Sequence, residues 1–389
     1  VWRKCIVRCI AIIRESTKVF KTVPGLIIWP LLTIAGLALV MVFGLIVGLY
    51  IFFGDASTYK DNLILVSEAI AEAANTSSTV DTYLTDETAT QWVFFAVHVF
   101  GVLWAIEFIK ACAWITMSGA VCYWYYFKNP TDHPTAPGDP QRFPLLNAFK
   151  RTVLYHMGSA AFGALIIAIC QLIRYILATI DYYTKDLQQE NFLYKMAIKC
   201  AQCAMWCLQK TIEFISYFGF VFIALEGQNF CQACKNTFAF LLEPKNAAQA
   251  AVNKTVEKLI VLIISWTTPT LMSLVCYGWL FNDAEYMTDH VNNPLYPAIL
   301  VWIGSFFIAD AIATVFECTI DTIFLCSFQD SKEYGGKYMS SDMREAFGLD
   351  VAEQEAAPIQ TSKDFKEKEA AARKRSVEIA GAGPPPAAV

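Results

Sequence analysis

A carboxylate and two indoles share one helical face inside a long apolar stretch of the sequence. Trp104, Glu107 and Trp114 are separated by three and seven residues, a spacing that places them along one side of an α-helix. A charge within a bilayer costs several kcal/mol unless it is paired or hydrated. A quaternary ammonium ion donates no hydrogen bond, so a site for it uses aromatic faces, each contributing ~0.5–2 kcal/mol, together with a carboxylate for net charge. The pattern therefore predicts a path for a cation.

A second set of acids lies in the last apolar stretch. Five side chains fall on one helical face there: Trp302, Phe306, Asp310, Glu317 and Asp321. A further acid lies within another apolar segment, at Glu226. We predict that Glu107 supplies the main countercharge for a cation, and that three of the other acids are weaker candidates: Glu226, Asp310 and Glu317.

Each of these acids also has a purely structural interpretation. Asp321 lies close to the expected membrane edge, where water can solvate it. Glu107 precedes Lys110 by three residues, so the two can form an ion pair on one helix. For a single residue the two interpretations are equally supported. Only the combination of acids with aromatic side chains favours a cation site.

Three cysteines, Cys200, Cys203 and Cys207, share one face of a predicted helix. No histidine or fourth thiol is suitably spaced nearby, and zinc prefers four ligands. An apolar stripe is the favoured interpretation, followed by S-acylation of a juxtamembrane cluster. We therefore expect neither a metal nor a cofactor.

Sequence signatures of catalysis are missing from the chain. It has no GxGxxG, P-loop, HExxH or GxSxG motif, and its four histidines are scattered. We therefore do not expect an enzyme.

The apolar stretches that carry these residues are long enough to cross a bilayer. Of 389 residues, 56% are apolar and 17% are charged, against roughly a quarter charged in soluble domains. Several apolar runs exceed about 18 residues, a length that favours transmembrane helices over buried soluble ones. The sequence predicts an all-α, polytopic transmembrane helix bundle over residues 22–329, with about six spans at roughly 23–53, 91–127, 151–183, 215–242, 257–281 and 296–327. Residues 192–214 are assigned to an amphipathic segment, on a side of the membrane that the sequence leaves open.

The charge distribution predicts the side of the membrane on which each flanking region lies. Residues 1–21 hold six basic residues against one acid, and we expect an amphipathic helix on the cytosolic leaflet. Residues 54–90 hold seven acids against one base, which predicts an extracellular or lumenal loop. Asn75 in that loop begins an N-glycosylation sequon. The polar, alanine-rich region 330–389 is expected to be a disordered cytosolic tail.

Three segments resemble the choline-transporter-like protein family, in the family's order along the chain. They are "FPLLNAFKRTVLYHMGSAAFGALIIAICQLIRYIL" at 143–177, "CLQKTIEF" with the following "GQNFCQACKNTFAFLL", and "IDTIFLCSFQD" at 320–330. Family members are longer, so the chain resembles their C-terminal portion, and its start at Val1 also suggests a fragment. The resemblance implies a carrier for choline, and in some members for ethanolamine, that supplies phospholipid synthesis.

The resemblance also implies roles for individual residues. Tyr155 and His156 belong to the Tyr-His-x-Gly-Ser segment of the family, which makes both candidates for the substrate path. His156 could shuttle protons, because imidazole changes its charge near physiological pH, although a role in helix packing fits it equally well. Three acids depart from the family pattern and make the interior more negative: Glu226, Asp310 and Glu317.

We therefore predict a multi-pass carrier that moves choline or a related amine by alternating access and performs no chemistry. Its expected partners are that small cation and the lipid bilayer, with no nucleic acid. The plasma membrane is the expected location, with a mitochondrial or other organelle membrane as the alternative. Two other function classes stay open: a transporter or channel for another organic or metal cation, and a truncated membrane protein that does not transport. The sequence determines neither the coupling ion nor the oligomeric state.

Overall fold

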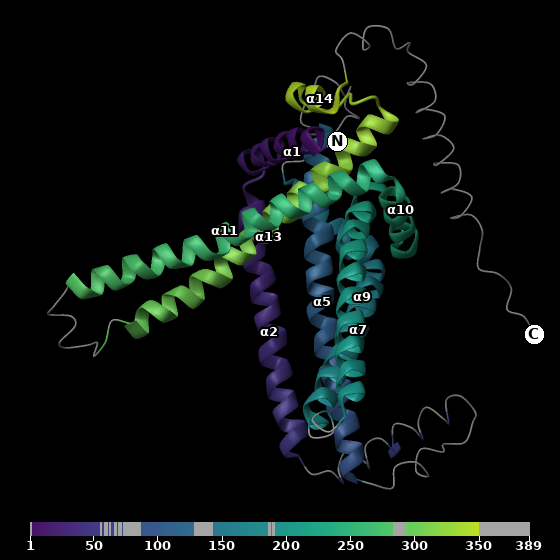
Figure 1. Cartoon of the computed structure of the whole chain (residues 1–389), viewed down its shortest axis with the longest axis vertical. Helices are drawn as coiled ribbons and strands as arrows, with labels where there is room; N and C mark the ends of the chain where they lie inside the picture. Colours follow the sequence, from purple (N-terminus) through teal and green to yellow (C-terminus); the bar gives the residue numbers. More distant parts are fainter. Residues whose placement is uncertain are drawn as a thin grey trace, which may run out of the picture.

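The computed structural model describes residues 2–54, 87–127, 143–185, 191–282 and 295–349, with a few isolated positions between these ranges. Within them every regular element is a helix, and six helices are long and apolar enough to cross a membrane (Figure 1). The prediction of an all-α, polytopic transmembrane protein is confirmed.

The helices follow one another along the chain as α1 (Trp2–Thr22), α2 (Gly25–Phe53), α5 (Glu87–Phe127), α6 (Pro144–Arg151), η1 (Thr152–His156), α7 (Met157–Tyr183), α9 (Phe192–Glu226), α10 (Phe230–Leu242), α11 (Pro244–Asn282), α13 (Leu295–Glu333) and α14 (Ser341–Phe347). The η1 turn is a π-helix that joins α6 to α7, so the three form one continuous run. The six candidate spans lie in α2, α5, the run from α6 to α7, α9, α11 and α13.

The long helices form two groups (Figure 1). In the first group α2, α5, α7 and α9 stand side by side, with α5 in contact with the other three. In the second group α11 and α13 pair with each other and lean away from the first group. α13 also contacts α5 and α2, while α1 and α14 lie at the end of the molecule where the chain begins.

α1 is amphipathic and lies across this end. Cys9, Ile12 and Val19 are buried on one face, against α11 and α13, whereas Arg14 and Lys18 are exposed on another. Pro24, two residues after the helix ends, has no backbone N–H with which to extend it. The break redirects the chain from α1 into the first span.

Gly44 and Gly48 allow α2 to approach α5 closely. A Cβ atom at Gly44 would lie 2.8 Å from a methyl carbon of Val102, and one at Gly48 would lie 3.6 Å from the ring of His98. Nε2 of His98 lies 2.8 Å from the carbonyl oxygen of Gly44. The small-residue pair on α2 therefore forms a helix contact.

The substitution Gly44→Leu is expected to lower the free energy of unfolding by about 1–3 kcal/mol, because a larger side chain overpacks the α2–α5 contact. Thermal unfolding of the purified chain in detergent measures the change. Gly101→Leu on α5 is the matched control, since a Cβ atom at Gly101 meets no neighbouring atom within 4 Å. Equal stability of the two variants would contradict a close contact at Gly44.

The fourth span differs from the expectation. In place of an amphipathic segment at 192–214 and a span at 215–242, the single helix α9 runs from Phe192 to Glu226. Gly227 ends it with a φ of 71°, a left-handed conformation that glycine adopts without strain. The side chain of Asn229 then caps α10 by accepting a backbone hydrogen bond. The structure thus corrects both expected boundaries.

Two lysines of this region, Lys199 and Lys210, pair with acids. Nζ of Lys199 lies 2.9 Å from Asp181, and Nζ of Lys210 lies 2.7 Å from Glu213. Pairing lowers the cost of carrying these charges on a spanning helix.

The C-terminal region is ordered further than the sequence predicts. The expected disordered tail begins at residue 330, but α13 continues to Glu333 and α14 follows it. Asp330 is buried and accepts hydrogen bonds of 3.0 Å from the hydroxyl of Tyr125 and from the backbone N–H of Tyr338. Because these bonds hold the segment against α5, the expectation of disorder was wrong for residues 330–349.

Two expectations concern residues that the structure does not describe. They are the glycosylation sequon at Asn75, with most of the loop at 54–90, and the remainder of the tail at 350–389. Both stay predictions from the sequence.

Candidate cation site

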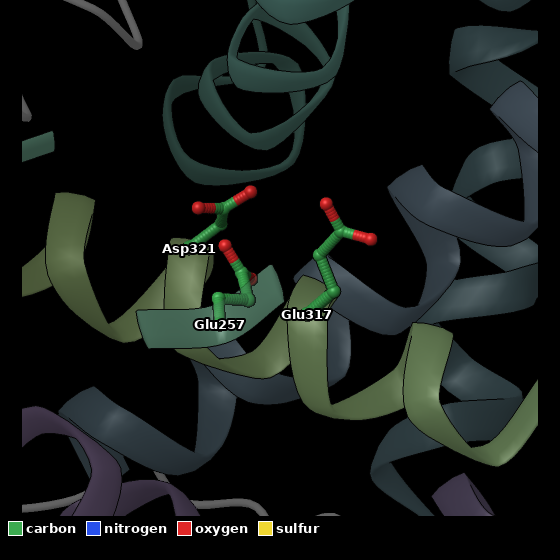
Figure 2. Close-up of side chains that lie close together, drawn as sticks. All are labelled: Glu257, Glu317 and Asp321. Carbon is green, nitrogen blue, oxygen red and sulfur yellow. The ribbon is translucent and has the colours of Figure 1, made fainter. Parts of the chain in front are cut away.

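One lysine and three carboxylates meet where α11 and α13 pair. Nζ of Lys254 lies 2.6 Å from Asp321, 3.0 Å from Glu257 and 3.0 Å from Glu317. Lys254 and Glu257 lie one turn apart on α11, and Glu317 and Asp321 lie one turn apart on α13, so helical spacing turns each pair to one side. Figure 2 shows the three acidic side chains extending in the same direction from the two helices.

The cluster is buried and holds more acids than cations. Glu257 and Asp321 are 1% exposed, whereas the side chain of Glu317 is 35% exposed. Oε1 of Glu257 and Oδ1 of Asp321 are buried without a hydrogen-bond partner among the described residues. A buried carboxylate is costly unless it is paired. A single ammonium group therefore balances three acids, and a further cation nearby would be stabilised.

The spacing of the acids suits one shared cation. Oxygen atoms of Glu257, Glu317 and Asp321 all lie within 4.8 Å of one another. Nζ of Lys254 contacts all three acids and so takes the place that a metal ion would need. We therefore treat this group, Lys254 with its three acids, as an internal ion cluster and call it the lysine cluster.

A hollow of about 280 Å³ adjoins the lysine cluster. Its lining includes Glu257, Lys258, Trp266, Phe306, Asp310 and Glu317. Lys258 is exposed at this hollow, while Glu257 and Glu317 belong to both the hollow and the cluster. The volume lies just below the range for drug-sized ligands, roughly 300–1,000 Å³, as suits a smaller ligand.

Aromatic rings form one wall of the hollow. Phe306 stacks on Trp302 with ring centroids 5.5 Å apart, and Trp302 meets Trp266 edge-on at 5.9 Å. Asp310 lies beside them, with Oδ1 3.4 Å from the hydroxyl of Ser265. Aromatic faces next to carboxylates are the groups that hold a quaternary ammonium ion.

α1 covers part of the lysine cluster. The rings of Phe20 on α1 and Phe316 on α13 lie 4.4 Å apart. Burial, and secondarily the nearby carboxylate of Glu257, raise the pKa of the Cys9 thiol to about 11. The thiol is therefore protonated at neutral pH.

Two of the predicted site residues, Asp310 and Glu317, line this hollow. Sequence reasoning did not single out Lys254, Glu257 or Trp266. Lys254 and Glu257 lie at the polar edge of the fifth apolar run, where they resemble an ordinary solvated helix end. The sequence feature that could have identified Lys254 and Glu257 is their spacing of three residues directly before an apolar run.

Glu107, Trp104 and Trp114 lie elsewhere, on α5. Glu107 is buried, and its Oε1 accepts hydrogen bonds of 2.9 Å from both Lys110 and Gln171. Trp104 is 38% exposed and donates its indole N–H to the carbonyl of Ala161. Trp114 is buried. None of the three residues lines the hollow between α11 and α13.

Three further predicted residues also lie away from the hollow. Tyr155 is exposed and His156 is half-buried, both in the π-helical turn η1. Glu226 is exposed at the end of α9, where it accepts hydrogen bonds from Gln228 and Asn236. Their roles in binding stay predictions.

α9 contacts both α5 and the lysine cluster. The ring centroid of Tyr217 lies 4.6 Å from that of Trp114 on α5. The next residue, Phe218, lies under Nζ of Lys254 with the ring centroid 5.7 Å away. Consecutive residues of α9 thus contact α5 and the lysine cluster.

Comparison with known proteins agrees with this chemistry. Residues 1–332 match the sequence model of a family described as plasma-membrane choline transporter. The chain belongs to the choline transporter-like family. The predicted family resemblance is thereby confirmed, and with the six candidate spans it makes the chain a multi-pass membrane protein.

Individual members of the choline transporter-like family are similar over much of the chain. Choline transporter-like 2 of Anopheles gambiae is 30% identical over 260 residues, which cover 66% of this chain and 31% of that protein. Choline transporter-like protein 4 of Xenopus laevis is 27% identical over 372 residues, covering 88% of this chain and 51% of that protein. Choline transporter-like protein 2 of Bos taurus is 27% identical over 358 residues, covering 86% and 49%. The chain spans about half the length, or less, of these relatives.

Proposed function

We propose that this chain is part of a membrane carrier for choline or a related amine, and that the hollow between α11 and α13 receives the cation. One observation carries the proposal: three carboxylates and two aromatic rings line one small hollow in membrane-spanning helices, namely Glu257, Asp310, Glu317, Trp266 and Phe306. Family membership and the names of the relatives support choline as the substrate. No enzymatic activity is proposed.

The aromatic wall favours an organic cation over a metal ion. Metal ions such as Ca²⁺ take oxygen ligands and gain little from indole rings, whereas trimethylammonium groups are held by ring faces. Lys254 already pairs with the three acids that lie closest together, Glu257, Glu317 and Asp321. A metal ion would therefore have to displace the ammonium group of Lys254. A carrier or channel for a metal ion is therefore the second candidate function.

Ethanolamine and phospholipid supply are finer parts of the same proposal. The ammonium group of ethanolamine can donate hydrogen bonds, and Glu317 and Asp310 offer acceptors for them. Uptake of either amine at the plasma membrane would supply phospholipid synthesis.

Trp266→Ala tests the proposed site. We expect it to weaken binding of radiolabelled choline to the purified chain by up to about thirty-fold, because one cation–π contact contributes ~0.5–2 kcal/mol. Uptake into proteoliposomes should fall in parallel. Trp279→Ala is the matched control, since Trp279 lies on the same helix and is similarly exposed but does not line the hollow.

Three outcomes distinguish the candidate functions. Weaker choline binding in Trp266→Ala alone supports the proposal. Choline binding that both variants retain places the amine site elsewhere and contradicts it. Saturable binding of Mn²⁺ or Ca²⁺ without choline binding supports the metal alternative.

A further inference from the structure

A second cavity lies at the end of the molecule where α1 and α14 meet. Its volume is about 560 Å³, and it is separate from the hollow at the lysine cluster. Its charged lining consists of Arg3, Lys4, Arg8, Arg14, Asp342 and Glu345. Four bases against two acids make this cavity attractive to anions.

Two of the bases build the walls of this cavity. Arg8 donates to the backbone carbonyls of Ala346 and Phe347 at 3.4 Å each, and its guanidinium lies 5.0 Å from the centroid of the Phe347 ring. Arg14 forms an ion pair of 3.0 Å with Asp342. These contacts tie α1 to α14 and hold the cavity between them.

The other two bases are available to a ligand. Arg3 and Lys4 are exposed, and neither forms an ion pair within the described part of the chain. The only acid of the lining beyond Asp342 is Glu345, which is also exposed. An anion entering the cavity would therefore meet unpaired positive charge on α1.

Apolar side chains beside these bases point to a membrane rather than to the aqueous phase. Ile6, Val7 and Ile10 are each about half exposed on the same helix, and Val7 and Ile10 line the cavity itself. α1 ends directly before the first candidate span, so it lies at the level where that span leaves the bilayer. Bases next to exposed apolar side chains, at the height of the headgroups, are typical of a surface that binds anionic lipid.

We propose that the cavity between α1 and α14 binds the headgroup of an anionic phospholipid from the adjacent leaflet. Arg3 and Lys4 contact the phosphate and any further headgroup acid, while Ile6 and Ile10 contact the acyl chains. The contact would fix the angle at which α1 lies against the membrane and against α11 and α13. This site is independent of the proposed amine site, because the two share no residue.

Native mass spectrometry of the purified chain in detergent tests the proposal by titration with dioctanoyl phosphatidylserine. Dioctanoylglycerol carries the same acyl chains without a charged headgroup, and glycerol 3-phosphate carries a phosphate without the chains. A choline lipid is avoided as the neutral control, because it could enter the proposed amine site. We expect saturable binding of phosphatidylserine and weak binding of the other two.

Arg3→Gln/Lys4→Gln is expected to weaken phosphatidylserine binding by on the order of thirty-fold, since each base near a membrane surface contributes about a factor of five. Lys21→Gln/Lys150→Gln is the matched control. It removes two exposed bases that lie near the same end of the spans but outside the cavity, and it should leave binding unchanged.

Each other outcome overturns the proposal. Equal losses in the two double variants would mean that total basic charge, not the cavity, attracts the lipid. Equal binding of glycerol 3-phosphate would identify a site for a soluble phosphate. Equal binding of dioctanoylglycerol would mean that only the acyl chains are recognised. Circular dichroism of both variants checks that α1 and the spans remain helical.

Discussion

Lys254→Met is expected to lower the free energy of unfolding by about 3–5 kcal/mol, the range observed when one partner of a buried ion pair is removed. Lys254 is the shared partner of Glu257, Glu317 and Asp321. Its removal leaves Glu257 and Asp321, each 1% exposed, without a compensating charge. Methionine keeps most of the apolar stem of lysine, so the loss measures the missing charge more than a cavity.

The expected loss has an internal rescue. In Lys254→Met/Asp321→Asn one buried carboxylate is gone together with the lysine, so part of the stability should return. Lys258→Met is the matched control, because Lys258 lies one turn further along α11 and is exposed. Its effect should stay within about 0.5 kcal/mol.

Thermal unfolding of the purified variants in one detergent measures these differences. If Lys254→Met is as stable as the natural chain, water or protons must neutralise the acids, and the lysine cluster is not held together as described. If the double variant is less stable than Lys254→Met, the two residues do not act as a pair.

The spans could be predicted from sequence, since a long apolar run has few alternatives to crossing the bilayer. The last span illustrates this: it was expected at 296–327, and the structure has a helix at Leu295–Glu333. The boundary of the fourth span was wrong, because residues 192–242 favour helix continuously and contain no proline, so that only Gly227 marks the end of α9.

The candidate site was only partly visible in the sequence, because it is built from distant residues. Asp310 and Glu317 stood out, since an acid within an apolar run is unusual by itself. Lys254 did not stand out, because its partners Glu317 and Asp321 lie 63 and 67 residues further along the chain. Only the pairing of α11 with α13 shows that this lysine offsets their charge.

The same pairing separates the acids into two kinds. Glu257 and Asp321 are buried and pair with Lys254, so they contribute mainly to stability, although Glu257 also lines the hollow. Glu317 contacts Lys254 but is 35% exposed and lines the hollow, and Asp310 is exposed there. Glu317 and Asp310 are therefore the more accessible carboxylates of the hollow for a cation.

Glu317→Gln/Asp310→Asn is accordingly expected to weaken choline binding by about ten- to a hundred-fold while leaving the unfolding temperature close to that of the natural chain. Hydrogen bonds and contacts to a charged group contribute about 1.5–3 kcal/mol, and both substitutions preserve side-chain shape. Stability should be retained because Lys254 keeps Glu257 and Asp321 as partners. This distinguishes the double variant from Lys254→Met, whose main expected effect is a lower free energy of unfolding.

A neutral analogue of choline makes the test specific for charge. In 3,3-dimethylbutan-1-ol a carbon atom replaces the quaternary nitrogen, so the molecule has the shape of choline without its charge. The natural chain should prefer choline strongly, whereas the double variant should bind the two ligands with similar affinity. Glu243→Gln is the matched control. Glu243 lies between α10 and α11, outside the hollow, so this variant should keep the preference for choline. A preference for choline that survives loss of both acids would show that the countercharge lies elsewhere, with buried Glu107 as the next residue to replace.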